Sequence, residues 1–198
     1  MTTHKTKGFS PSCDRNKQPI LERLCVHFKA CKHVLEIGSG TGQHAVFFAE
    51  HLPHLMWHTS DMLDYHGSIQ AWMADANLPN LVAPIEFHFG KQAWPRLDLD
   101  GVFTANTTHI MPRDAAQLMM QTIATQLKSG GVFCQYGPMN VNGEYTSEGN
   151  REFDQQLQQS GCGGIRDLAE LVEWAEGMEL TEQIAMPANN FLLVWKVR

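Results

Sequence analysis

The sequence lacks the features that mark several special classes of protein. No apolar run approaches the roughly 20 residues that cross a bilayer, so no membrane-spanning helix is predicted. The five cysteines are odd in number and include no C-x-x-C pair, which predicts reduced thiols. Basic residues are in the minority, 15 Lys and Arg against 21 Asp and Glu, and the net charge of -6 argues against a non-specific nucleic-acid or membrane-surface binder.

Linkers, repeats and low-complexity segments are also missing, so the sequence predicts one domain over residues 1–198. The polar start, residues 1–8, has no apolar core typical of a secretory signal, and a cytoplasmic protein is expected. We expect residues 1–19 to form an N-terminal loop and residues 20–198 to form the core. A helix is predicted to begin at Ile20, where apolar residues start to recur at helical spacing.

The most informative stretch is a glycine-rich turn between a short apolar run, residues 33–37, and a predicted helix, residues 43–52. Glycines let the backbone approach a ligand closely, and the first N–H groups of the helix offer hydrogen-bond donors. A dinucleotide fingerprint, G-x-G-x-x-G, would require a third glycine where Gln43 stands. The pattern here is Glu36-x-Gly38-x-Gly40-x-Gly42.

Strands and helices are predicted to alternate through the rest of the chain, as in an α/β fold. The expected strands cover residues 55–60, 84–89, 98–106, 132–136, 179–185 and 191–197, and the expected helices cover residues 67–76, 113–128, 148–159 and 166–176. The last two strands, one alternating and one almost wholly apolar, are joined by a turn and form an antiparallel hairpin. Ligands of such sheets bind beyond the carboxyl ends of the strands.

Asp61 ends the second predicted strand about 20 residues after the glycine turn, where nucleotide-binding sheets place the acid that accepts hydrogen bonds from ribose hydroxyls. An ionised carboxylate suits this role because it only accepts hydrogen bonds. Asp64 is the alternative if the strand ends later, although Asp64 is also suited to cap the following helix.

The acidic residue before G-x-G-x-G resembles motif I of the class I S-adenosylmethionine-dependent methyltransferases. More narrowly, the chain resembles the methyltransferase-like 26 family, whose substrate is unassigned. That second resemblance rests on Phe9-Ser-Pro, Arg15-Asn-Lys, residues 36–44, Asn106-x-x-His109, Tyr136-Gly-Pro138 and Met186-Pro-Ala-Asn-Asn190. The implied fold is a Rossmann-like, seven-stranded sheet, parallel except for an antiparallel strand seven, with helices on both faces.

The resemblance implies S-adenosylmethionine as cofactor and S-adenosylhomocysteine as product. Gly38, Gly40 and Gly42 would line its methionine and ribose part, and Glu36 would orient the turn or bind the methionine ammonium. Further cofactor contacts are expected from residues at the ends of the second and third strands and before the first: Asp61, Met62, His88, Arg15 and Lys17. His88 stands where many of these enzymes have an adenine-binding Asp, and it can equally be a half-buried histidine. Arg15 and Lys17 can pair with a carboxylate or be ordinary solvated charges.

The acceptor side is expected beyond the fourth and fifth strands. His109 is the candidate base, since an unperturbed pKa of about 6.5 suits proton removal near neutrality, and its alternative is a structural histidine. Asn106 and Tyr136 are candidates to orient the substrate. The Asn/Asp-Pro-Pro-aromatic motif of amine-methylating enzymes is replaced by residues 106–109, so transfer to an exocyclic amine is not supported.

The sequence therefore predicts an S-adenosylmethionine-dependent methyltransferase that acts on a small molecule, without nucleic-acid or membrane partners. The alternative is a protein that binds the cofactor without transfer, as a sensor or a subunit of a complex. A nicotinamide oxidoreductase is a third possibility. No metal site is predicted, and His51, His54 and His58 are interpreted as surface histidines.

Overall fold

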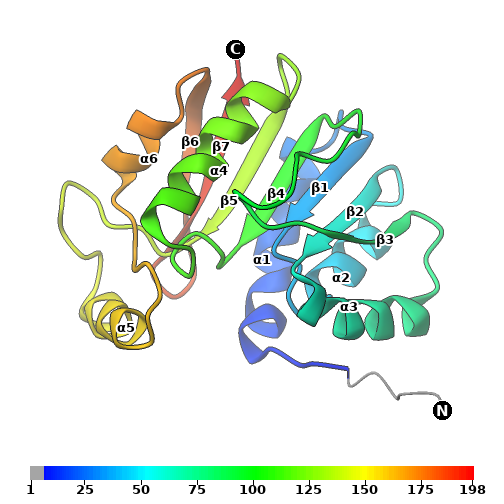
Figure 1. Cartoon of the computed structure of the whole chain (residues 1–198), viewed down its shortest axis with the longest axis horizontal. Helices are drawn as coiled ribbons and strands as arrows, with labels where there is room; N and C mark the ends of the chain where they lie inside the picture. The colour runs from blue at the N-terminus through cyan, green and yellow to red at the C-terminus, as the bar shows by residue number, and fades with distance from the viewer. Residues whose placement is uncertain (1–6) are drawn as a thin grey trace. The chain divides into compact units, whose positions relative to one another are not determined.

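The structure, a computed structural model, describes residues 7–198. Within this range, helices and strands alternate through the third strand, and after it two strands or two helices follow one another in places (Figure 1). The helices are α1 (Pro11–His27), α2 (Gln43–His51), α3 (Leu63–Ala76), α4 (Arg113–Gln126), α5 (Glu148–Gln159) and α6 (Leu168–Trp174). The strands are β1 (His33–Ile37), β2 (Met56–Asp61), β3 (Leu81–Glu86), β4 (Gly101–Ala105), β5 (Val132–Gly137), β6 (Met178–Met186) and β7 (Asn190–Val197).

The strands belong to one seven-stranded sheet in the order β3-β2-β1-β4-β5-β7-β6. β2 pairs in parallel with both β1 and β3, whereas β7 is antiparallel to both β5 and β6. This pairing confirms the predicted antiparallel strand seven, and it places β7 between β5 and β6. The chain forms two compact units, Met1–Phe103 and Thr104–Arg198, whose residues pack mainly within their own unit, and the division falls within β4.

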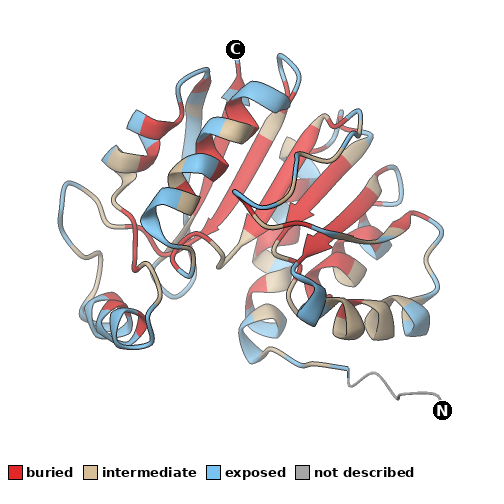
Figure 2. Ribbon diagram, viewed as in Figure 1, coloured by how far each residue is buried: buried red, intermediate tan, exposed pale blue. Residues whose placement is uncertain are grey.

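The first unit has its core around the parallel strands β1, β2 and β3, whose buried positions are red in Figure 2. Trp57 of β2 is fully buried, and its ring centroid lies 6.4, 5.5 and 5.8 Å from those of Phe28, Phe48 and Phe103. α2 packs on β2 and β3, and both α1 and α3 contact α2. Burial of such side chains stabilises the unit by about 1.5–3 kcal/mol each, which fixes the strand ends that carry the glycine turn.

The second unit is built on β5, β7 and β6. β7 is the central strand of these three, and its residues Leu192–Trp195 are buried because neighbouring elements cover both faces. α4 contributes the fully buried Met119 and Met120 and packs against α6. β6 has a mostly exposed burial pattern, as the alternating sequence predicts for an edge strand.

The predicted N-terminal loop is wrong beyond residue 10, because α1 begins at Pro11. Ser10 is the N-cap, its side-chain oxygen accepting from the N–H of Cys13, and proline is favourable in the first turn. The prediction failed because the first half of α1 is polar and half exposed, so it has no apolar periodicity to detect. Arg15 and Lys17 are therefore helical residues.

Other predicted boundaries shift by a few residues. β3 ends at Glu86, three residues before the predicted end, so His88 lies in a turn after the strand. α3 begins at Leu63 rather than residue 67, directly after Asp61 and Met62. His58 is not a surface histidine, because it lies in β2 and is only 7% exposed. No helix in the described part of the chain is long and apolar enough to cross a membrane.

Candidate functional site

The glycine turn connects β1 to α2 in the first unit, and Gly38, Gly40 and Gly42 all have positive φ angles, 72°, 56° and 92°. At Gly42, an added Cβ would come within 2.9 Å of the Ile69 Cα, so glycine is required there for packing on α3. At Gly40, an added Cβ would meet no atom within 4 Å. The backbone of Gly40 therefore borders open space, as a backbone that contacts a ligand must.

Hydrogen bonds tie this turn to the end of β2. The N–H groups of Gly38 and Ser39 both donate to the Ser60 carbonyl at 3.0 Å. The Ser60 hydroxyl donates to the Glu36 carbonyl at 2.7 Å. The turn is thus held rigidly at the carboxyl ends of two parallel strands.

Asp61 is the last residue of β2 and lies against the turn. Its Oδ2 accepts from the N–H of Gly40, and its Oδ1 accepts from the N–H of Met62, both at 2.7 Å. Each oxygen keeps a further lone pair. Burial raises the pKa of Asp61, whereas these backbone hydrogen bonds lower it. Asp64 instead lies exposed in the first turn of α3, so the structure favours Asp61 as the acid at the glycine turn.

Glu36 is a second buried acid beside Asp61. Only 2% of its surface is exposed, and its Oε2 accepts from the indole N–H of Trp57 at 3.1 Å. Burial raises its pKa to about 7, and the charge of Asp61 acts in the same direction. Within residues 7–198, no basic side chain forms an ion pair with either acid. Two buried acids without a counter-ion favour a cationic ligand.

Met62 and His88 also lie near Asp61. Met62 is 43% exposed although apolar, and it is followed by exposed Leu63 and Tyr65 at the start of α3. The N–H of Phe87, directly before His88, donates to the Asp61 carbonyl at 3.0 Å. The His88 Nδ1 is buried without a hydrogen-bond partner among the described residues. The structure therefore places the exposed apolar Met62 next to Asp61, and His88 on the segment that bonds to the Asp61 backbone.

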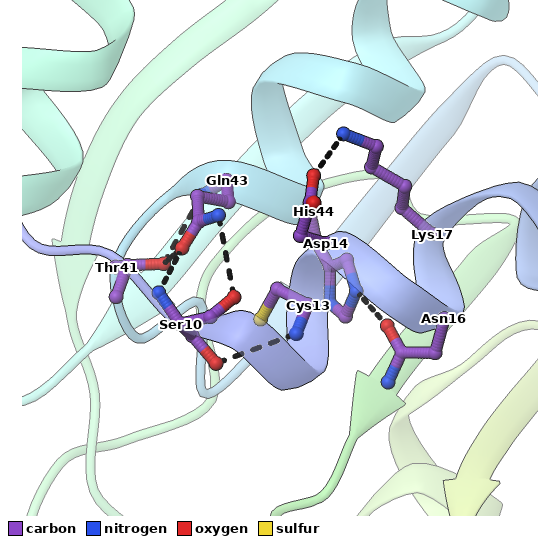
Figure 3. A network of polar contacts seen from close by, with 8 residues as sticks. All are labelled: Ser10, Cys13, Asp14, Asn16, Lys17, Thr41, Gln43 and His44. Atoms are coloured by element: carbon purple, nitrogen blue, oxygen red, sulfur yellow. Dashed lines mark hydrogen bonds and ion pairs between the residues drawn. The ribbon is translucent and has the colours of Figure 1, made fainter.

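A polar network that the sequence did not reveal joins the start of α1 to the turn (Figure 3). The Gln43 side-chain oxygen accepts from the N–H of Ser10 at 2.5 Å and from the Thr41 hydroxyl at 3.0 Å. The Gln43 amide also donates to the Ser10 carbonyl at 3.4 Å. Gln43, which departs from the dinucleotide fingerprint, thus anchors the N-terminal segment.

Figure 3 also shows how α1 presents its polar residues. Asn16 is buried and its Oδ1 lies 2.7 Å from the Nε2 of His44, whose pKa is lowered to about 4 by burial. Lys17 pairs with Asp14, and Arg15 donates to the Ser12 hydroxyl at 3.3 Å. Arg15 and Lys17 thus have partners within α1, whereas the unpredicted Asn16 reaches inward.

In the second unit, the structure brings Asn106, His109 and the end of β5 together. A Cβ built on Gly137, the residue after Tyr136, would lie 3.7 Å from the Nδ1 of His109 and 3.8 Å from the Oδ1 of Asn106. Asn106 has a left-handed φ of 56°, and its N–H donates to the Tyr136 carbonyl at 2.9 Å. A left-handed non-glycine residue after a strand often marks a functional turn.

His109 has a much lower pKa than its unperturbed value. Burial lowers this pKa to about 4, the Arg166 charge acts in the same direction, and Asp154 opposes both effects. The ring packs edge-on against Phe153 with centroids 5.4 Å apart. Its pKa therefore lies below the unperturbed value that made it a candidate base, because burial and a neighbouring cation both disfavour the imidazolium. At pH 7 His109 is neutral.

A buried network positions the turn that carries these residues. The Gln135 amide donates to the Thr108 hydroxyl at 2.9 Å, and the Trp195 indole N–H donates to the Gln135 oxygen at 3.1 Å. All three side chains are at most 3% exposed. No local sequence signal identifies this network, since its members lie far apart in the chain.

Comparison with known proteins gives a family and a fold. The model of a family described as "Protein of unknown function (DUF938)" matches residues 7–197. Among solved structures, an O-methyltransferase family protein from Burkholderia thailandensis is 14% identical with a TM-score of 0.76, and the match covers 91% of this chain and 56% of that one. Human N-acetylserotonin methyltransferase in complex with S-adenosylmethionine is 12% identical with a TM-score of 0.72, over 91% of this chain and 54% of that one.

The O-methyltransferase NcsB1 from neocarzinostatin biosynthesis, in complex with S-adenosylmethionine and 2-hydroxy-5-methyl naphthoic acid, is 17% identical with a TM-score of 0.78. That match covers 94% of this chain and 55% of that one. The chain thus spans just over half the length of these structures. The likeness confirms the predicted class I methyltransferase fold.

Proposed function

The chain belongs to the DUF938 family, and we propose that it binds S-adenosylmethionine and transfers the methyl group to a small molecule. The observation that carries this proposal is the pair of buried acids, Glu36 and Asp61, of which Asp61 accepts from the N–H of Gly40, whose backbone borders open space. S-adenosylmethionine carries a positive sulfonium, an ammonium and two ribose hydroxyls. Each of these groups is complementary to an ionised carboxylate.

The residues of the first unit fit the cofactor. Asp61 keeps one lone pair on each oxygen for ribose hydroxyls while its other lone pairs hold the turn. Glu36 would receive the methionine ammonium, which supplies the missing counter-charge. Gly38, Gly40 and Gly42 would border the methionine and ribose, and Met62 and His88 would border the adenine. When bound, the cofactor supplies a methyl group already activated for in-line displacement.

In the second unit, His109 and Asn106 are proposed to act on the acceptor, together with Tyr136. A neutral His109 can accept a proton, but a pKa of about 4 makes it a weak base near pH 7. Catalysis is therefore expected to depend mainly on orientation, which can lower the barrier by ~7–11 kcal/mol, against ~2.7–5.4 kcal/mol for a strong general base. Asn106 would orient the acceptor through its side-chain amide.

The acceptor is proposed to be a small molecule, and two structural relatives support this class. NcsB1 is complexed with a naphthoic acid, and an O-methyltransferase family 2 protein from Planctomyces limnophilus is complexed with apigenin. The net charge of -6 also disfavours nucleic acid as a partner.

We further propose a cytoplasmic location and a closer relationship to the methyltransferase-like 26 family. Arg15 and Lys17 are proposed to bind the carboxylate of the methionine part of the cofactor.

The proposal is tested by melting the protein with S-adenosylmethionine, S-adenosylhomocysteine or NAD. A ligand at a hundredfold excess over its Kd stabilises the protein by about 2.7 kcal/mol, and we expect this for the first two only. Release of S-adenosylhomocysteine with cell metabolites, beyond a no-enzyme control, then identifies an enzyme. Tight binding without turnover identifies a sensor or complex subunit, and stabilisation by NAD alone contradicts the proposal.

A further inference from the structure

Arg166 of the second unit is a buried cation without a carboxylate partner. The residue is only 6% exposed. Its Nη2 donates to the Met111 carbonyl at 3.0 Å, whereas its Nε is buried with no hydrogen-bond partner among the described residues. Guanidinium groups stay charged at all physiological pH values, so this charge is buried with incomplete hydrogen bonding. Buried charges are normally paired because an unpaired one is costly.

Two acids, Asp154 and Glu170, act on Arg166 by their charge, but both are already engaged elsewhere. The Asp154 oxygens accept from the Tyr145 hydroxyl at 2.7 Å and from the N–H of Ile165 at 2.6 Å. Glu170 pairs with Arg113, the Nε–Oε1 distance being 2.9 Å, and closes the capping box of α6. Neither acid forms an ion pair with Arg166 within residues 7–198. An anion from outside the chain would complete its pairing.

The backbone around Arg166 keeps it close to His109. The N–H of Gly164 donates to the His109 carbonyl at 3.0 Å. A Cβ on Gly163 would lie 2.1 Å from the Arg166 Nη2, so glycine is needed there to admit the guanidinium. Met111, which holds the guanidinium, is in the same turn as His109. Arg166 is thus fixed to the turn that carries the proposed acceptor residues.

Two exposed apolar residues adjoin His109, one in the sequence and one by a ring contact. Ile110, the next residue, is 54% exposed, and Phe153 of α5, which packs on the His109 ring, is 38% exposed. Large apolar residues with this exposure adjoin the turn whose Met111 carbonyl holds the buried cation, and they suit a ligand with an apolar body and one negative end.

We propose that Arg166 binds a carboxylate-bearing small molecule with an apolar body, and that Ile110 and Phe153 contact this body. The assignment of that molecule as the methyl acceptor rests on the proposed function, whereas the carboxylate site itself does not. A planar guanidinium with its Nε unpaired can bind a carboxylate through two parallel hydrogen bonds. The acceptors expected are therefore small aromatic or aliphatic acids that carry the methylated group elsewhere.

The test measures binding of benzoate to the full chain without S-adenosylmethionine, by calorimetry and thermal melting at constant ionic strength. Benzamide is the neutral control of the same shape. We expect benzoate at ten times its Kd to raise the Tm by about 3–5 °C, and benzamide to leave it unchanged. Acetate, which lacks the apolar body, should bind more weakly than benzoate. Equal effects of benzoate and benzamide on the wild-type protein would overturn the proposal.

Variants locate the site. Arg166→Gln should abolish the benzoate shift, and Arg166→Lys should retain a weaker one. Arg151→Gln is the matched control, because Arg151 is exposed and pairs with Glu148, an acid that does not act on Arg166. A benzoate shift that survives in a folded Arg166→Gln protein, or that disappears in Arg151→Gln alone, contradicts the assignment. If Arg166→Gln does not fold, the carboxylate site is still tested by comparing benzoate with benzamide on the wild-type protein and by the weaker benzoate shift expected of Arg166→Lys.

The two proposals fail separately. Binding of S-adenosylmethionine without binding of benzoate overturns the carboxylate site and leaves the cofactor proposal intact. Binding of benzoate at Arg166 without binding of S-adenosylmethionine supports the anion site and removes the assignment of its ligand as a methyl acceptor.

Discussion

Replacing Asp61 by asparagine removes one negative charge at the end of β2 and leaves the shape of the side chain almost unchanged. In the wild-type protein both oxygens accept backbone hydrogen bonds at 2.7 Å, from Gly40 and Met62. An asparagine side chain at this position can accept only one of these, and its amide group then faces the other N–H. The variant should therefore bind S-adenosylmethionine less tightly, both through the lost ribose contact and through a less ordered turn.

The expected magnitude follows from the charge of the lost acceptor. Hydrogen bonds to charged groups contribute about 1.5–3 kcal/mol, so the loss of one ribose contact predicts a Kd about 10- to 150-fold higher. Titration calorimetry with S-adenosylhomocysteine measures this Kd directly. A chemical denaturation without ligand shows how much stability the turn loses, so that affinity is compared between folded proteins only.

Asp64→Asn provides the matched control, since Asp64 is an exposed aspartate in the first turn of α3, three residues from Asp61 in the sequence. Its affinity should stay within about twofold of wild type. An unchanged Kd in Asp61→Asn, or an equal loss in both variants, would refute the role of Asp61 as the ribose-binding acid.

Three further predictions concern titratable groups. Burial raises the pKa of Glu36 from 4.5 to about 7, so the folded protein retains a proton that the unfolded chain releases. Stability should then fall by roughly 3 kcal/mol as the pH rises from 4.5 to 7, and this fall should be absent from urea melts of Glu36→Gln. Burial lowers the pKa of His44 from 6.5 to about 4, so its contribution to stability is present above pH 6.5 and is lost as the pH falls toward 4. The acid limb of the stability curve should flatten in His44→Gln, and an unchanged limb would show that His44 does not titrate as described. His109→Gln should slow methyl transfer and leave cofactor affinity near wild type, and the wild-type rate should show no ionisation of His109 between about pH 5 and 8, since its pKa is lowered to about 4. A loss of melting temperature without a kinetic change would make His109 structural.

Much of the fold could be predicted because its signals are local. Apolar runs, helical spacing and the glycine turn located every helix and strand of the described chain, most of them to within a few residues. The buried pattern of β7 beside the alternating β6 predicted the antiparallel end of the sheet. The first half of α1 was missed because an N-cap at Ser10 and a proline at residue 11 begin a polar helix without apolar periodicity.

A candidate site residue could be predicted only where a suitable side chain stands at a predicted strand end or turn. Asp61 could be placed at the end of β2 because strand ends follow from hydrophobicity, and its hydrogen bond to Gly40 connects the two motifs, whereas its role toward ribose stays a prediction. The low pKa of His109 was not predictable, since it depends on burial and on Arg166, far away in the sequence. The network of Gln135 with Thr108 and Trp195 is hidden for the same reason.

The central claim is that a cationic nucleoside binds at the glycine turn of the first unit, and an NMR titration of the ¹⁵N-labelled chain with S-adenosylmethionine tests it residue by residue. We predict saturable shifts of the backbone amide signals of Gly38, Gly40, Gly42 and Met62, with one common Kd. Unchanged amide signals throughout the turn at millimolar S-adenosylmethionine would contradict the account.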